Sequence, residues 1–146
     1  MFESVLVVCT GNICRSPMGE YLLRQRWGRA GARIASAGTA ALVNHPADPD
    51  ACAVMSGQGI DMAAHRARQL DAAMVAEHEL ILTMEPHHQR WVQQRFPTAR
   101  GRVYPMTQWL PGQDPVVDPY CQGREAFEHC WTQLEPAVAS WVERLG

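Results

Sequence analysis

A cysteine and an arginine near the N-terminus have a spacing that suits phosphate chemistry. Cys9 follows the apolar run at residues 4–8, and Arg15 comes after a short loop that contains Gly11. The backbone N–H groups of such a loop can converge beside the positive end of a helix dipole, where a dianion binds well. The guanidinium of Arg15 can hold two phosphate oxygens at once. Because the same positive field favours a thiolate, we predict that Cys9 is a nucleophile in a phosphate-binding loop.

Helix signals follow the predicted loop directly. Between Cys9 and Arg15 the loop consists of Thr10, Gly11, Asn12, Ile13 and Cys14. Ser16 is a preferred N-cap residue and Pro17 a preferred first helical residue, so we expect a helix to begin here. The Ser16 hydroxyl is also within plausible reach of the Cys9 sulfur. The alternative is that Cys9 is a small buried apolar residue, since a cysteine and an arginine at this spacing also occur together by chance.

The basic residues exclude two kinds of enzyme. All 13 are arginine, and the chain of 146 residues contains no lysine. A Walker-type nucleotide loop needs a lysine on the phosphates, and a Schiff-base mechanism needs a lysine amine. The net charge is −2 and no basic block is present, so we expect no nucleic-acid partner.

Cysteine usage and the apolar pattern favour the reducing cytoplasm. The 5 cysteines are an odd number, which argues against a disulfide framework. No basic region precedes the first apolar run, so we expect no signal peptide, and no apolar stretch approaches the ~20 residues that span a bilayer. We also expect no metal site. No second Cys/His pair follows Cys9 and Cys14 at a suitable spacing, and the adjacent His87 and His88 should point in different directions on a helix.

Strand and helix patterns alternate along the chain. Expected strands occupy residues 4–8, 32–36, 80–84 and 103–104, expected helices about 17–29, 49–57, 86–95 and 123–145, and expected loops 38–49 and 111–121. This order predicts one α/β domain over residues 1–146, with a parallel sheet covered by helices on both faces. In such sheets ligands bind beyond the carboxyl ends of the strands, which is where Cys9 lies.

The last predicted helix has one apolar face and contains a proline. The apolar residues at helical spacing are Phe127, Cys130, Trp131, Leu134, Val138, Trp141, Val142 and Leu145. Pro136 lies within this pattern. We expect it to bend the helix or to break it in two, because proline lacks an N–H and its ring clashes with the preceding turn.

The segment from Val8 to Met18, VCTGNICRSPM, resembles the signature of the low-molecular-weight protein tyrosine phosphatases. Ser36-Ala37-Gly38 is similar to the family's second-strand ending, residues 65–70 to its mid-chain segment, and Asp118-Pro119-Tyr120 to its general-acid loop. The likeness covers nearly the whole chain. It implies a single domain with a four-stranded parallel sheet and helices on both faces, and it implies no metal and no cofactor.

The resemblance implies a role for each residue that carries chemistry. Cys9 would attack phosphorus to give a phosphocysteine, and Arg15 would bind the equatorial oxygens as charge shifts in the transition state. Asp118 would protonate the leaving phenolate and then activate the water that frees phosphate. An aspartate before a proline is otherwise a common turn residue, so the role of Asp118 depends on the signature loop.

Further residues match supporting positions of the family. Asn12, Ser36 and His65 match positions that brace the phosphate loop by hydrogen bonds. The alternative for His65 is an exposed histidine at a helix end. Cys14 matches a cysteine that could trap oxidised Cys9 as a disulfide and so spare it from irreversible oxidation.

Three features of the resemblance bear on the substrate. Ile13 agrees with members that act on phosphotyrosine, whereas bacterial relatives acting on phosphoarginine tend to carry threonine there. Leu42 stands where eukaryotic members usually carry an aromatic wall residue, which leaves Tyr120 as the aromatic wall for a phosphotyrosyl ring. The segment 40–45 looks like the bacterial subgroup paired with tyrosine autokinases of capsule and exopolysaccharide export. The implied partner is therefore a phosphotyrosine-containing protein, namely such a kinase.

Two other functions share part of this pattern. A thioredoxin-coupled arsenate reductase has this fold and a similar loop, but its chemistry needs two further cysteines close together in mid-chain. No cysteine lies between residues 53 and 120, and Cys121 and Cys130 come too late in the chain. A catalytically silent phosphate-binding module would be expected to lose Cys9, Arg15 or Asp118, and all three are present.

Overall fold

The predicted strands pair into one parallel sheet. The computed structural model describes residues 2–146. Its strands are β1 (Ser4–Cys9), β2 (Arg33–Gly38), β3 (Leu80–Thr83) and β4 (Val103–Pro105), in the spatial order β2-β1-β3-β4. Strand β1 is buried along its whole length, because it lies inside the sheet with helices over both faces. Its last residue, Cys9, pairs with Gly38 at the carboxyl edge of the sheet.

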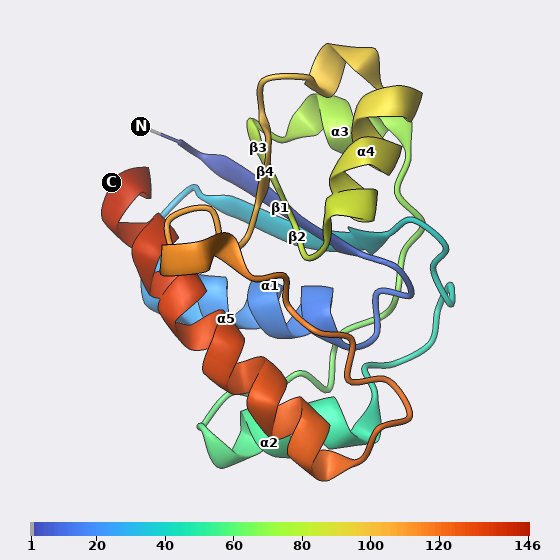
Figure 1. The fold of residues 1–146 in the computed structure, drawn as a ribbon, viewed down its shortest axis with the longest axis vertical. Helices are drawn as coiled ribbons and strands as arrows, with labels where there is room; N and C mark the ends of the chain where they lie inside the picture. Colours follow the sequence, from blue (N-terminus) through green and yellow to red (C-terminus); the bar gives the residue numbers. More distant parts are fainter. Residues whose placement is uncertain (1) are drawn as a thin grey trace.

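Helices form a layer on each side of the sheet. Within residues 2–146 they are α1 (Arg15–Trp27), α2 (Pro49–Gly57), α3 (Ala72–Glu77), α4 (Pro86–Arg95) and α5 (Arg124–Leu145), with short 3-10 turns at Pro97–Ala99 and Pro111–Gln113. Figure 1 shows α1, α2 and α5 on one face and α3 and α4 on the other. Alternating side chains of β1 supply both layers: Val5 and Val7 join the core under α1 and α5, and Leu6 and Val8 join the core under α3 and α4.

The expected fold class is confirmed, and the predicted strands and helices are present with small shifts at their ends. Helix α3 was not predicted, because its 6 residues are too few to show a helical period. Asp71 caps α3 by accepting a hydrogen bond from the backbone N–H of Met74 at 2.9 Å.

The expected N-cap at Ser16 is wrong. Helix α1 begins at Arg15 with Cys14 as its N-cap, so Ser16 lies inside the first turn. Its Oγ accepts a hydrogen bond from Nδ2 of Asn12 at 2.7 Å and lies 2.9 Å from Sγ of Cys9. The hydroxyl therefore serves the phosphate loop instead of the helix backbone.

Of the two outcomes expected for Pro136, a bend or a break in the helix, the break does not occur, because α5 runs without interruption over 22 residues. Its buried side chains include Phe127, Leu134, Val138 and Trp141. A proline inside a helix costs about 3 kcal/mol, whereas burial of one large apolar side chain stabilises by about 1.5–3 kcal/mol. Packing of this face therefore outweighs the lost hydrogen bond. None of the helices in residues 2–146 is both long and apolar enough to cross a membrane.

Candidate functional site

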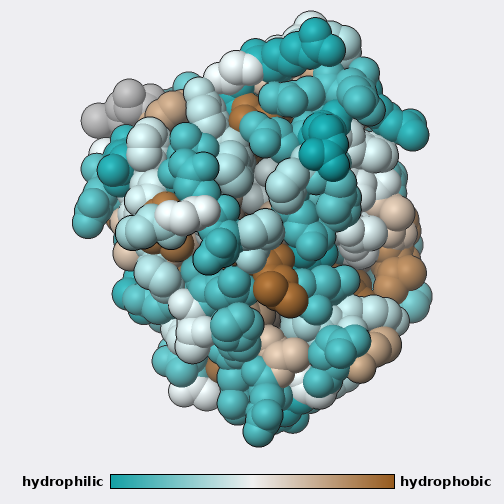
Figure 2. All heavy atoms as spheres, in the orientation of Figure 1, coloured by the Kyte–Doolittle hydropathy of each residue, from teal (hydrophilic) through white to brown (hydrophobic). Residues whose placement is uncertain are grey.

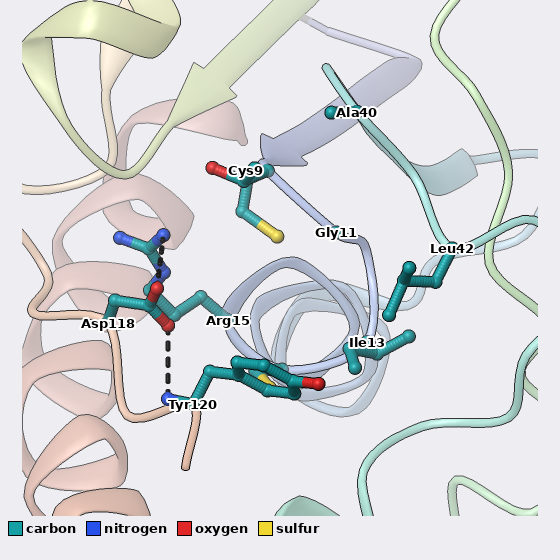
Figure 3. Close-up of a pocket in the computed structure, with 10 residues that line it drawn as sticks. Cys9, Gly11, Ile13, Arg15, Ala40, Leu42, Asp118 and Tyr120 are labelled. Atoms are coloured by element: carbon teal, nitrogen blue, oxygen red, sulfur yellow. Dashed lines mark hydrogen bonds and ion pairs between the residues drawn. The ribbon is translucent and has the colours of Figure 1, made fainter. Parts of the chain in front are cut away.

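A pocket opens at the carboxyl edge of the sheet, where β1 leads into the loop before α1. Its volume is about 230 Å³. Three separate segments supply its lining residues, which are Cys9, Thr10, Gly11, Ile13, Cys14, Arg15, Ala40, Leu42, Asp118 and Tyr120. Figure 3 shows the Cys9 side chain pointing into the space that the other labelled residues surround. The fold thus gathers the residues that the sequence predicted for catalysis and for the substrate walls.

The loop after Cys9 offers a row of hydrogen-bond donors. No group within residues 2–146 accepts a hydrogen bond from the backbone N–H of residues 11–16. These groups lie where α1 begins, so the helix dipole adds positive potential at the same place. Free donors in a curved loop suit a tetrahedral anion with several acceptor oxygens.

Asn12 holds the loop in shape through four hydrogen bonds. Its φ of 57° lies in the left-handed region, which asparagine tolerates better than most residues. Its Nδ2 donates to Oγ of Ser16 at 2.7 Å and to Oγ of Ser36 at 2.9 Å, and its Oδ1 accepts from the Arg68 N–H at 2.9 Å. Nε2 of His65 donates to the backbone carbonyl oxygen of Asn12 at 2.7 Å. His65 is buried, so the alternative of an exposed histidine does not hold.

A buried carboxylate that sequence reasoning missed extends this network. Ser36 donates to Oε1 of Glu20 at 2.5 Å, and Nη2 of Arg24 lies 2.6 Å from the other oxygen. Glu20 stands one helical turn after Ser16 in α1, and that spacing was the available signal. Because Ser16 accepts from the amide of Asn12, its own proton is free to point at the Cys9 sulfur.

Arg15 is buried beside the pocket and held by backbone and carboxylate. It is 2% exposed, and its Nη1 donates to the carbonyl oxygen of Val116 at 2.9 Å. The same nitrogen lies 3.0 Å from Oε2 of Glu85. Burial alone would raise the pKa of Glu85, but hydrogen bonds from Arg15 and His87 hold that pKa below its ordinary value. The guanidinium therefore keeps a charged partner, which no local sequence pattern indicated.

Asp118 and the wall residues stand at the mouth of the pocket. Asp118 is 52% exposed and belongs to the loop before α5. Its Oδ1 accepts a hydrogen bond from the N–H of Tyr120 at 3.1 Å. Leu42 is held near the opposite wall, because its backbone N–H donates to the carbonyl of Gly11 at 3.1 Å. Ile13, Leu42 and Tyr120 surround the opening in Figure 3.

Cys14 is the last residue of the phosphate loop and is also part of the hydrophobic core. Cys9 and Cys14 are both buried, and both are free thiols. Burial, followed by the negative charge of Asp48, raises the pKa of the Cys14 thiol far above its ordinary value. On α5, burial raises the pKa of Cys130 to about 12. Both of these thiols are therefore protonated at neutral pH.

The expectation that His87 and His88 point apart is wrong. Their ring centroids lie 4.0 Å apart, and ligand-type atoms of Glu85, His87 and His88 all lie within 4.8 Å of one another. Both rings turn back toward the residue that precedes the helix: Nε2 of His87 lies 2.8 Å from Oε2 of Glu85, and Nδ1 of His88 accepts from the Glu85 N–H at 3.1 Å. These atoms are engaged in hydrogen bonds within the protein, and we assign no metal to them.

Exposed apolar side chains gather near the pocket. The face in Figure 2 is mostly hydrophilic, with small and separate hydrophobic areas. The exposed large hydrophobic residues in the described part of the chain are Leu42, Val43, Trp109, Val117 and Tyr120. All except Trp109 either line the pocket or are adjacent in sequence to a residue that does. An apolar rim around a polar floor suits a ligand with an aromatic body and an anionic tip.

Comparison with known proteins shows what the chain is similar to. The profile of the family described as "Low molecular weight phosphotyrosine protein phosphatase" matches residues 4–146. "Low molecular weight protein-tyrosine-phosphatase Etp" of Escherichia coli K12 is 45% identical over 144 residues, which are 99% of this chain and 95% of that protein. The tyrosine phosphatase Wzb from Escherichia coli K30, solved in complex with sulphate, has a TM-score of 0.94 and 40% identity over 100% of both chains. The YwlE arginine phosphatase from Geobacillus stearothermophilus has a TM-score of 0.91 and 31% identity over 99% of this chain and 93% of that chain.

Proposed function

Because the chain belongs to the low molecular weight phosphotyrosine protein phosphatase family, we propose that Cys9, Arg15 and Asp118 carry out its reaction. The enzyme is a protein-tyrosine-phosphatase, and its partner is a phosphotyrosine-containing protein. One observation supports the three roles above all: the sulfur, the free loop N–H groups, the guanidinium and the carboxylate meet in one pocket.

In the first step, the Cys9 thiolate attacks phosphorus and the bond from phosphorus to the phenolic oxygen breaks. The product is a phosphocysteine, and Asp118 gives its proton to the leaving oxygen. In the second step, the Asp118 carboxylate takes a proton from water as the water oxygen attacks phosphorus. Cys9 then leaves as a thiolate, and inorganic phosphate is released.

Arg15 and the loop stabilise the charge that moves through these steps. The N–H groups of residues 11–16 can donate to the non-bridging oxygens, and Arg15 adds a permanent positive charge that its partners hold in place. The relative Wzb was solved with sulphate, a tetrahedral dianion of similar size to phosphate. This likeness supports a phosphate site in the loop.

The walls of the pocket favour an aromatic phosphoester. Ile13, Leu42 and Tyr120 present apolar surface at the opening, which a phenyl ring can cover and a short aliphatic phosphoester cannot. The experiment compares kcat/KM on peptides of one sequence that carry phosphotyrosine, phosphoserine or phosphoarginine. We expect phosphotyrosine to be preferred by roughly 100-fold or more, which corresponds to about 2.7 kcal/mol. Equal rates on phosphoserine or on phosphoarginine would overturn the assignment of substrate.

We further propose that the physiological substrate is a bacterial tyrosine autokinase of capsule or exopolysaccharide production, and that the enzyme works in the cytoplasm. The resemblance of residues 40–45 to that bacterial subgroup supports the kinase, and the 5 free cysteines support a reducing compartment. The test is to incubate the Cys9→Ser variant with the phosphorylated cytoplasmic domain of such a kinase. Phosphorylation-dependent capture is expected. Failure of the wild-type enzyme to dephosphorylate that domain would contradict the proposal.

A further inference from the structure

His88 links the first turn of α4 to the phosphate loop. Its side chain is fully buried, with 0% of the residue exposed, and it does not line the pocket. Nε2 of His88 lies 2.8 Å from Oγ1 of Thr10. Thr10 directly follows the nucleophile and does line the pocket. One hydrogen bond therefore joins the start of the loop to a side chain of a distant helix.

The tautomer of His88 follows from its other nitrogen. Nδ1 lies 3.1 Å from the backbone N–H of Glu85, which can only donate, so Nδ1 must accept. The ring proton is then on Nε2, which donates to Oγ1 of Thr10. Burial, followed by the charges of Arg15 and His87, lowers the pKa of His88 to about 3. The neutral ring and its direction of donation thus persist across the working range of pH.

The first turn of α4 and the residue before it hold both ends of the loop. Glu85 pairs with Arg15 at the far end, with 3.0 Å between Oε2 and Nη1, while His88 holds Thr10 at the near end. Among residues 2–146, His88 is the only hydrogen-bond partner of Oγ1 of Thr10. The free N–H groups of residues 11–16 can converge on one anion only if both ends of the loop are fixed.

We propose that His88 is a positioning residue of the phosphate site: its Nε2–H anchors the Thr10 hydroxyl and thereby fixes the start of the loop relative to Cys9. His88 acts through Thr10 and does not touch the substrate. The inference rests on the proposed function, since it assigns a task within the same site. Loss of the anchor should weaken anion binding and turnover together, because both depend on the same loop geometry.

His88 makes two contacts, one with Thr10 and one with the backbone N–H of Glu85 at the start of α4, and two substitutions at position 88 separate their effects. In His88→Asn, Oδ1 can still accept from the Glu85 N–H, but the shorter side chain does not reach Thr10. In His88→Gln, the longer amide places a donor near the position of Nε2. We expect kcat/KM on p-nitrophenyl phosphate to fall roughly 10-fold in His88→Asn and the inhibition constant of inorganic phosphate to rise roughly 5-fold or more. His88→Gln should recover a clear part of both losses.

Thr10→Val tests the same hydrogen bond from the other side, because it removes the acceptor and keeps the shape. If the two side chains act through one contact, the double variant Thr10→Val/His88→Asn should be no worse than the poorer single variant. His78→Asn is the matched control. His78 is also buried, its Nδ1 lies 2.7 Å from the carbonyl oxygen of Met74, and it precedes β3 at the opposite edge of the sheet. Its substitution should lower stability and leave the inhibition constant of phosphate within about 2-fold.

The proposal would be overturned if a folded His88→Asn variant kept both its phosphate inhibition constant and its kcat/KM within about 2-fold of wild type. It would also be overturned if the losses in kcat/KM of the two single variants multiplied in the double variant. An equal rise of the phosphate inhibition constant in His78→Asn would overturn it as well. If His88→Asn does not fold, His88→Gln and Thr10→Val alone decide through the phosphate constant. Failure of the proposed function would show differently, as turnover that survives Cys9→Ser. Phosphate affinity can be measured in that variant as well, so the two failures are distinguishable.

Discussion

Nη2 of Arg15 lies 3.8 Å from Oδ2 of Asp118, although Arg15 begins α1 and Asp118 belongs to the loop before α5. The guanidinium is buried and the carboxylate is half exposed. The separation exceeds a direct hydrogen bond, so the two groups attract without being locked together. Asp118 can therefore reach toward a leaving group at the mouth while Arg15 stays beside the phosphate loop.

Asp118→Asn should remove the proton donor and leave the phosphate loop intact. Phosphate affinity should hardly change. A phenolate with a pKa near 10 needs the proton, whereas p-nitrophenolate is a better leaving group and needs it less. We expect kcat on phosphotyrosyl peptides to fall roughly tenfold or more beyond the fall on p-nitrophenyl phosphate.

Asp114→Asn is the matched control for this general acid. Asp114 is an exposed acid in the same loop but does not line the pocket. Its substitution should change both substrates by less than about 2-fold across pH. If Asp114→Asn produced the leaving-group-dependent loss and Asp118→Asn did not, the general acid would be misassigned.

Cys9→Ser should abolish turnover and keep anion binding, since the loop N–H groups and Arg15 remain. Phosphate or vanadate binding can be followed by calorimetry alongside p-nitrophenyl phosphate hydrolysis. Turnover above ~0.1% of wild type would exclude Cys9 as the nucleophile.

Oxidation should join Cys9 to Cys14, with the sulfenic acid of Cys9 reacting with the Cys14 thiol to give a disulfide and water. Burial raises the pKa of Cys14, so little thiolate exists at neutral pH. Closure after mild peroxide should therefore be slow and should accelerate from about pH 7 to about pH 9. In Cys14→Ser, activity should recover less completely with thiols; equal recovery of both proteins would contradict protection by Cys14.

Gly38→Ala should disrupt the phosphate loop from the neighbouring strand. A Cβ at Gly38 would lie 2.2 Å from the carbonyl oxygen of Thr10, which is backbone and cannot turn aside. We expect a loss of stability of about 2 kcal/mol or more and a marked fall in kcat/KM. Gly57→Ala, where a Cβ meets nothing within 4 Å, should be neutral or slightly stabilising in urea denaturation.

Stability should fall as the pH drops below the ordinary pKa of the buried His88. His88 has an ordinary pKa of 6.5 and a pKa of about 3 in the folded protein, so between these pH values its ring is protonated in the unfolded chain and neutral in the folded one. The contribution of His88 to the unfolding free energy is therefore highest above pH 6.5 and declines as pH falls toward 3, by up to about 1.4 kcal/mol per pH unit. Burial lowers the pKa of His78 as well, which adds to the slope.

The window between pH 6.5 and pH 4.5 isolates the histidines, because Glu85 contributes only below its ordinary pKa of 4.5. Denaturant titrations of wild type and His88→Asn across this window give the unfolding free energy as a function of pH. The slopes of the two plots should differ by an amount that corresponds to the uptake of up to one proton on unfolding. Identical slopes would show that His88 is not held neutral in the folded enzyme.

Local chemistry in the sequence was enough to predict the parallel sheet, which the structure confirms, and to propose Cys9 as the nucleophile and Arg15 as the phosphate-binding residue. Cys9, the loop and Arg15 are contiguous, and the buried strands show themselves as short apolar runs, so neighbouring residues carry this information. The position of Cys9 in a pocket followed from the rule that ligands bind beyond the carboxyl ends of parallel strands. Asp118 was found through the family resemblance, because an aspartate before a proline is locally just a turn residue.

Only the tertiary structure decided which groups hold that chemistry in place. Glu85 and His88 reach the loop because β3 lies beside β1, so their contacts join residues that no local period relates. The Ser16 hydroxyl could either cap the helix or bind the loop, and the sequence alone favoured the cap. In the folded protein the hydroxyl accepts a hydrogen bond from Asn12 and therefore belongs to the loop. Helix α5 is continuous despite Pro136, because burial of the opposite face stabilises it by more than the lost backbone hydrogen bond costs. Such outcomes depend on free-energy differences between contacts made at long range, and those contacts exist only once the chain has folded.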